Sequence, residues 1–137
     1  MTIYGIKTCS TVGKARKFMK ENGIDFEFVD YKVESVGEEK IREWLKQLDI
    51  NVLFNNRGTK YRDLKLKELN LDDEGKIAWM AKENYLLKRP VIEYGDGKVH
   101  VTYNEDEYRE LFLETILNKS IPIFLYNHKK GYILKNY

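Results

Sequence analysis

Cysteine, proline and histidine are scarce in this chain of 137 residues, which has one cysteine, two prolines and two histidines. A single cysteine excludes an intramolecular disulfide and any cysteine-rich metal site, and we expect no bound metal. The sequence also lacks a long apolar run and an apolar N-terminal signal segment, so we expect a cytoplasmic protein whose thiol stays reduced. The charges of its 24 basic and 22 acidic residues nearly cancel, so the net charge alone does not indicate nucleic-acid binding.

Apolar periodicity in the first third of the chain predicts a strand, a helix and a second strand. Residues 2–6 form a short apolar run, and residues 12–22 carry apolar side chains at helical spacing before Gly23. Residues 24–31 alternate apolar and polar side chains, which is typical of a strand. Such a βαβ unit predicts two parallel strands joined by a right-handed crossover.

The rest of the chain predicts helices followed by a hairpin. Residues 37–48 have a helical apolar face, residues 51–71 predict short helices around an exposed polar loop, and Asp72 or Asp73 can cap the next helix. After Pro90, the turn Gly95-Asp96-Gly97 separates two apolar segments and predicts a β-hairpin. Asn104 then caps a further helix.

This order of elements predicts an α/β fold that is thioredoxin-like, with a four-stranded mixed sheet flanked by helices and a helical insertion. We expect residues 1–117 to form this domain. Residues 118–137 are then a C-terminal extension, for which the sequence leaves open an edge hairpin or a disordered tail.

Cys9 lies in the polar turn between the first strand and the first helix. A thiol there faces the free N–H groups and the positive end of the helix dipole, which lower the pKa of a cysteine and favour the reactive thiolate. The alternative is a small buried apolar residue, which is the usual environment of a lone cysteine. Its polar neighbours favour the functional interpretation.

Four segments make the chain similar to the ArsC/Spx family of arsenate reductase-like proteins. They resemble, in order, the family's strand–Cys–helix opening, its central loop, its Arg-Pro segment and the Spx-like end of its domain. These are residues 4–16, 53–64, 86–92 and 103–107, and the resemblance covers roughly residues 1–117.

The resemblance implies that Cys9 is a nucleophile and that Arg89 and Arg57 bind the anionic part of a substrate. It also implies a proline loop beside the cysteine, with a cis Arg89–Pro90 bond. The chain departs from the family pattern at two places. Val12 stands where redox-sensing members have a second cysteine, and the hairpin offers Lys98 and His100 where arsenate-reducing members have a third arginine.

The function predicted from these residues is that of a thiol-dependent reductase that uses glutathione as co-substrate and has no bound cofactor. Ser10, Thr11 and Pro90 are the predicted thiol-binding residues, and the hydroxyls of Ser10 and Thr11 either donate to the thiolate or cap the helix, with capping favoured. Two alternatives stay open. The chain is an arsenate reductase proper, or it is a regulator resembling Spx that binds the RNA polymerase alpha subunit.

Overall fold

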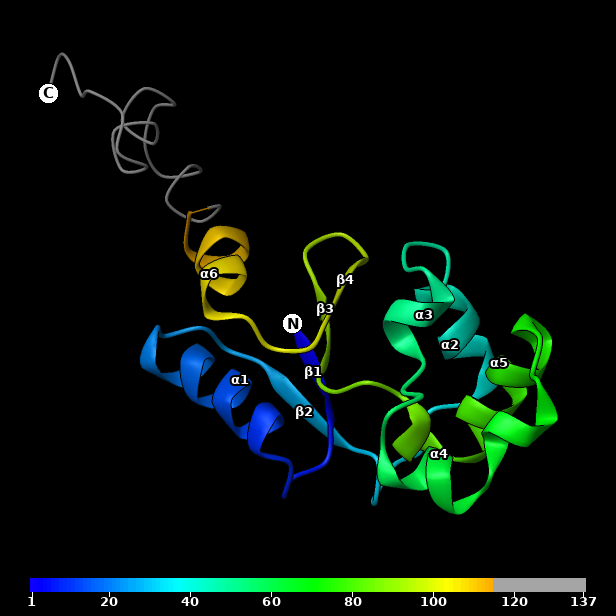
Figure 1. Ribbon diagram of the computed structural model, residues 1–137. Helices are drawn as coiled ribbons and strands as arrows, with labels where there is room; N and C mark the ends of the chain where they lie inside the picture. Colours follow the sequence, from blue (N-terminus) through cyan, green and yellow to red (C-terminus); the bar gives the residue numbers. More distant parts are fainter. Residues whose placement is uncertain (115–137) are drawn as a thin grey trace, which may run out of the picture. The chain divides into compact units, whose positions relative to one another are not determined.

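A computed structural model describes residues 1–114, which fall into two compact units, Met1–Tyr103 and a second unit that begins at Asn104. The first unit contains a four-stranded sheet in the order β2-β1-β3-β4 (Figure 1). Its strands are β1 (Thr2–Gly5), β2 (Glu27–Asp30), β3 (Val91–Tyr94) and β4 (Lys98–Val101). The pair β1/β2 is parallel, whereas β1/β3 and β3/β4 are antiparallel, which confirms the predicted mixed sheet.

Helix α1 (Ser10–Glu21) connects β1 to β2, and its Val12 lies against Gly5, which shares a face of the sheet with Ile3 because side chains alternate along a strand. Its buried residues are Val12, Ala15, Phe18 and Met19, the helical face that the sequence predicts. A Cβ atom at Gly5 would lie 2.6 Å from Cγ2 of Val12. Glycine therefore permits the first turn of α1 to pack closely against the end of β1.

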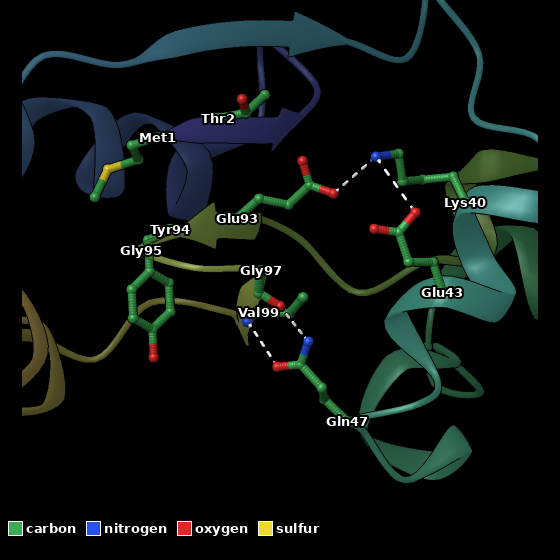
Figure 2. Close-up of a pocket in the computed structure, with 10 residues that line it drawn as sticks. All are labelled: Met1, Thr2, Lys40, Glu43, Gln47, Glu93, Tyr94, Gly95, Gly97 and Val99. Atoms are coloured by element: carbon green, nitrogen blue, oxygen red, sulfur yellow. Dashed lines mark hydrogen bonds and ion pairs between the residues drawn. The ribbon is translucent and has the colours of Figure 1, made fainter.

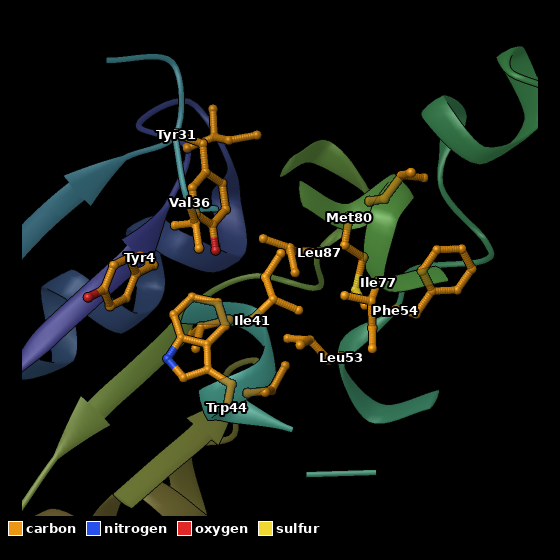
Figure 3. Packing of buried hydrophobic residues seen from close by; sticks show 14 of the residues in the cluster. Tyr4, Tyr31, Val36, Ile41, Trp44, Leu53, Phe54, Ile77, Met80 and Leu87 are labelled. Carbon is orange, nitrogen blue, oxygen red and sulfur yellow. The ribbon is translucent and has the colours of Figure 1, made fainter. Parts of the chain in front are cut away.

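The opposite face of the sheet is covered by the helical segment between β2 and β3. Tyr4 and Val91 belong to a buried cluster with side chains of this segment, among them Ile41, Trp44 and Met80 (Figure 3). The segment consists of α2 (Glu38–Trp44), α3 (Ile50–Leu53), α4 (Thr59–Asp63), the 3-10 turn η1 (Leu66–Leu69), α5 (Asp73–Lys82) and the 3-10 turn η2 (Asn84–Leu86).

The caps that the sequence predicts are present at two helices. The Asp72 carboxylate accepts a hydrogen bond from the Gly75 N–H at 2.8 Å and so caps α5. In the second unit, Asn104 accepts from the Glu107 N–H at 2.9 Å and caps α6 (Glu105–Tyr108), which continues as the π-helical η3 (Arg109–Glu114). The predicted extension 118–137 lies outside the described residues, so its separation from a domain over 1–117 stays a prediction.

Candidate functional site

Cys9 is the N-cap residue of α1 and lies at the end of the turn that follows β1. Its N–H donates to the Ile6 carbonyl at 3.0 Å, and its own carbonyl accepts from the Gly13 N–H at 2.9 Å. Cys9 is partly buried and packs against the core cluster. Because Cys9 itself is the N-cap, the prediction that Ser10 or Thr11 caps this helix is wrong; Ser10 is the exposed first helical residue.

Three groups around the sulfur favour its negative form. Burial raises the pKa of the Cys9 thiol, but the backbone N–H groups of Val12 and Thr11, together with the guanidinium of Arg89, outweigh burial and hold the pKa below its ordinary value. These donors are main-chain N–H groups of the first helical turn, as predicted from the position of Cys9, and the hydroxyls of Ser10 and Thr11 are not among them. A helix N-terminus and one cation therefore activate the thiol.

Arg89 belongs to the segment that enters β3, and its peptide bond to Pro90 is cis, as predicted. The Arg89 side chain is partly buried: its Nη1 donates to the Tyr85 carbonyl at 3.2 Å, and its Cζ lies 5.6 Å from the centroid of the Tyr85 ring. Pro90 is buried. The structure thus brings Cys9 and Arg89 together, although 80 positions of the chain separate them.

Tyr31 adds a group to this site that no motif of the sequence marks. It follows the end of β2, its ring is 6% exposed, and its N–H donates to the Gly5 carbonyl at 2.9 Å. Burial raises the pKa of the Tyr31 hydroxyl, and the nearby Arg89 charge opposes that rise. The hydroxyl points into the buried cluster against which Cys9 also packs (Figure 3).

Two buried polar atoms of the site have no hydrogen-bond partner among the described residues. They are Nε of Arg89 and the hydroxyl oxygen of Tyr31. An unpaired buried polar group costs roughly 1–3 kcal/mol, so proteins rarely keep one without a reason. Beside an activated thiol, two such atoms are suited to pair with the polar atoms of a bound ligand.

Arg57 lies elsewhere in the first unit, in the loop between α3 and α4. Its side chain is exposed, its N–H donates to the Asn55 side chain at 3.2 Å, and its carbonyl accepts from Arg62 at 3.0 Å. Among the described residues, the cation that acts on the Cys9 thiol is Arg89. The assignment of Arg57 to the site of Cys9 therefore stays a prediction.

A separate cavity of about 250 Å³ is lined by β1, α2 and the β3–β4 hairpin and does not include Cys9 (Figure 2). The Glu93 carboxylate in its wall accepts hydrogen bonds from Trp44 at 2.8 Å, Tyr4 at 2.9 Å and Lys40 at 3.0 Å. Burial raises the pKa of Glu93, but these donors outweigh it and hold the pKa below the usual range. Both carboxylate oxygens are occupied, so this network ties the sheet to α2.

Residues 1–114 contain no group of three or more His, Cys, Asp or Glu side chains placed to hold a metal ion. Within the same part of the chain, no helix combines the length and the apolar character that crossing a membrane requires.

Comparison with known proteins agrees with this geometry. The model of the ArsC family matches residues 4–111. An uncharacterized protein of Haemophilus influenzae is 35% identical over 82% of this chain and 98% of its own length. The solved structure of an arsenate reductase (ArsC) related protein of Brucella melitensis is 36% identical, covers 82% of this chain and 93% of its own chain, and has a TM-score of 0.64. The global transcriptional regulator Spx 1 of Oceanobacillus iheyensis is 25% identical over 85% of this chain and 89% of its own length.

Proposed function

Because the chain belongs to the ArsC family, which has arsenate reductase-like and Spx-like members, we propose that it is a glutathione-dependent thiol reductase with Cys9 as its nucleophile. One observation carries this proposal. The Cys9 sulfur lies at a helix N-terminus beside Arg89, and both lower its pKa. Thiol–disulfide exchange needs a thiolate, and it is fastest when the pKa of the attacking thiol is near ambient pH.

The reaction has two exchange steps. The Cys9 thiolate attacks the glutathione sulfur of a mixed disulfide; a bond between Cys9 and glutathione forms, and the substrate leaves as a thiolate that takes up a proton. A second glutathione, as its thiolate, then attacks the glutathione sulfur bound to Cys9. Oxidised glutathione is released and the Cys9 thiolate is restored, so one substrate disulfide is reduced while two glutathione molecules end as one disulfide.

The resolving thiol must come from outside the chain. Val12, at the position where a Cys-x-x-Cys motif has its second cysteine, is fully buried and packs against Gly5. Cys9 is the one cysteine of the sequence. A small thiol that is abundant in the reducing cytoplasm is the simplest resolving agent, and we place the reaction in that compartment.

Reduction of arsenate is a second candidate, favoured by the likeness to the arsenate reductase (ArsC) related protein of Brucella melitensis. In this reaction the Cys9 thiolate displaces an oxygen of arsenate as water, two glutathione thiols are oxidised to their disulfide as arsenate is reduced to arsenite, and Cys9 is released as its thiolate. Arg89, with Arg57 as the proposed second arginine, binds the oxyanion. The β4 residue Lys98, in the region of the missing third arginine, is exposed. Lysine offers a point charge where arginine offers a planar fork, so we rank this reaction below thiol reduction.

A regulator that binds the RNA polymerase alpha subunit is the candidate from another class, favoured by the Spx relatives. Binding of this kind needs no turnover at Cys9. The test is a pull-down with purified alpha subunit, in which the Cys9→Ser protein would bind as well as the wild type.

Thiol reduction is tested in two steps. Intact-mass analysis after incubation with oxidised glutathione should show one glutathionyl group per chain, and none on Cys9→Ser. A coupled assay with a glutathione mixed disulfide, and separately with arsenate, then measures turnover. Glutathionylation of Cys9 followed by turnover of the mixed disulfide supports the proposal. If Cys9 stays unmodified and the pull-down is positive, the reductase proposal is overturned in favour of the polymerase-binding regulator.

A further inference from the structure

A groove of about 490 Å³ lies along the segment that follows α3 and is lined by four basic side chains, a tyrosine, an asparagine and one glutamate. We call it the basic groove; these residues are Asn56, Arg57, Tyr61, Arg62, Lys65, Lys67 and Glu68. The segment from the loop before α4 through η1 supplies all of them. None of them lowers the pKa of the Cys9 thiol, and Arg57 is the one member that the arsenate alternative also uses.

The charges of the basic groove are not neutralised within residues 1–114. All four basic side chains are exposed, and the ion pairs of this part of the chain join other residues, such as Arg42 with Glu74 and Lys60 with Glu83. Four cations and one carboxylate give the groove a formal charge of +3, while the whole sequence carries +2. The four exposed cations therefore make the groove a local region of positive charge.

Exposed apolar side chains accompany these cations. Leu64 and Leu69, on the same segment, are 37% and 55% exposed. The partly buried Tyr61 ring packs edge-to-face against Phe54 at 5.8 Å and is held in place by it. A duplex nucleic acid would meet the cations but would leave these leucines unused, and a formal charge of only +2 over the sequence gives little net attraction for polyanions.

The segment also adopts a backbone conformation that is unusual for its residue type. Lys65 has a φ of 54°, in the left-handed region that glycine adopts most easily. Lys65 is the N-cap residue of η1, between α4 and η1, and it lines the groove. The lysine side chain adds a positive charge at a position where the backbone conformation favours glycine, which has no side chain.

From these observations we propose that the basic groove binds an acidic peptide segment of a partner protein. The segment carries several carboxylates, which pair with the four cations, and at least one large apolar side chain, which covers the exposed leucines. This interaction is independent of thiol chemistry, so it holds whether or not the function proposed for Cys9 is correct.

The test uses a fluorescein-labelled synthetic peptide of alternating Asp/Glu and Leu/Phe residues, with fluorescence anisotropy as the readout. We expect saturable binding that weakens as salt is raised, because screening acts on exposed charges. The double variant Lys65→Gln/Lys67→Gln should raise Kd about fivefold. The matched control Lys17→Gln/Lys46→Gln removes two exposed lysines outside the groove and should leave Kd unchanged.

Two further variants distinguish an effect on peptide binding from an effect on folding and from an effect on thiol chemistry. Lys65→Gly removes the charge but suits the left-handed backbone, so it should weaken binding while thermal stability stays equal or rises. Cys9→Ser should bind as the wild type does. Failure of the probe to bind, equal losses in both double variants, or equal competition by a DNA duplex, inorganic phosphate or polyglutamate would each overturn the proposal of an acidic, partly apolar peptide.

Discussion

Arg89 is the residue whose charge acts on the Cys9 thiol. Replacing it by alanine removes that cation, so the pKa of Cys9 should rise and alkylation by iodoacetamide near neutral pH should slow several-fold. The measurement is the pH dependence of the labelling rate. Arg57→Ala is the matched arginine control and should leave the profile unchanged, since Arg57 is exposed in another loop. A wild-type profile like that of a free thiol would contradict the activation of Cys9.

The Tyr31 hydroxyl is buried without a partner among the described residues, a situation that normally costs stability. We therefore expect Tyr31→Phe to leave the free energy of unfolding unchanged or to raise it by up to about 1 kcal/mol. Glutathionylation of Cys9 should at the same time slow several-fold, because the site loses one of its two unpaired polar groups. Chemical denaturation and timed mass spectrometry measure the two effects.

Tyr61→Phe provides the comparison for this prediction, because it removes a hydroxyl from a tyrosine of the basic groove. It should change neither stability nor the rate at Cys9. A clear loss of stability in Tyr31→Phe with an unchanged rate would show that the Tyr31 hydroxyl is structural.

Asn84 joins two elements of the helical segment through its buried amide. It accepts from the Val36 N–H at 2.7 Å and donates to the Val36 and Met80 carbonyls at 3.0 and 2.9 Å, which ties the chain before α2 to the end of α5. Asn84→Ala leaves these buried groups unpaired and should lower the free energy of unfolding by about 2–4 kcal/mol.

Asn84→Asp tests the same contact without changing its shape, because a carboxylate can accept from Val36 but cannot donate to either carbonyl. It should also destabilise. Asn56→Ala, at an exposed position, should change the free energy of unfolding by less than about 0.5 kcal/mol. Urea denaturation compares the three proteins, and an Asn84→Asp protein as stable as the wild type would exclude the donor role of the amide.

Glu93 connects β1, β3 and α2 and makes the stability of the whole first unit depend on pH. Its pKa is lower in the folded protein than in the unfolded chain, because Trp44, Lys40 and Tyr4 donate to the carboxylate. The contribution of Glu93 to the stability of the fold is therefore fully present at pH values above the ordinary glutamate pKa of about 4.3. It is lost as the pH falls through the lower pKa of the folded state.

We expect Glu93→Gln to be less stable than the wild type near neutral pH and to lose less stability on acidification. Urea unfolding at a series of pH values measures this. Glu39→Gln, an exposed change on α2, should follow the wild-type curve. Parallel curves for Glu93→Gln and the wild type would show that the network does not control the acid response.

At the scale of the whole molecule, the fold was largely predictable from the sequence because its signals are local. The apolar face of residues 12–19, the alternation of the strands and the Gly95-Asp96-Gly97 turn each report the conformation of neighbouring residues. The position of Cys9 at the start of a helix follows from the same local pattern. The cis Arg89–Pro90 bond was expected from family resemblance, and the structure confirms it.

Only the tertiary structure decided which distant groups meet. Arg89 and Arg57 were both candidates for the site of Cys9, and the sheet brings Arg89 to the thiol while the α3–α4 loop leaves Arg57 exposed. Tyr31 and Glu93 looked like ordinary strand residues, since their roles depend on partners far away in the chain. Periodicity determines which face a side chain occupies, but the pairing of polar groups across elements depends on how those elements pack.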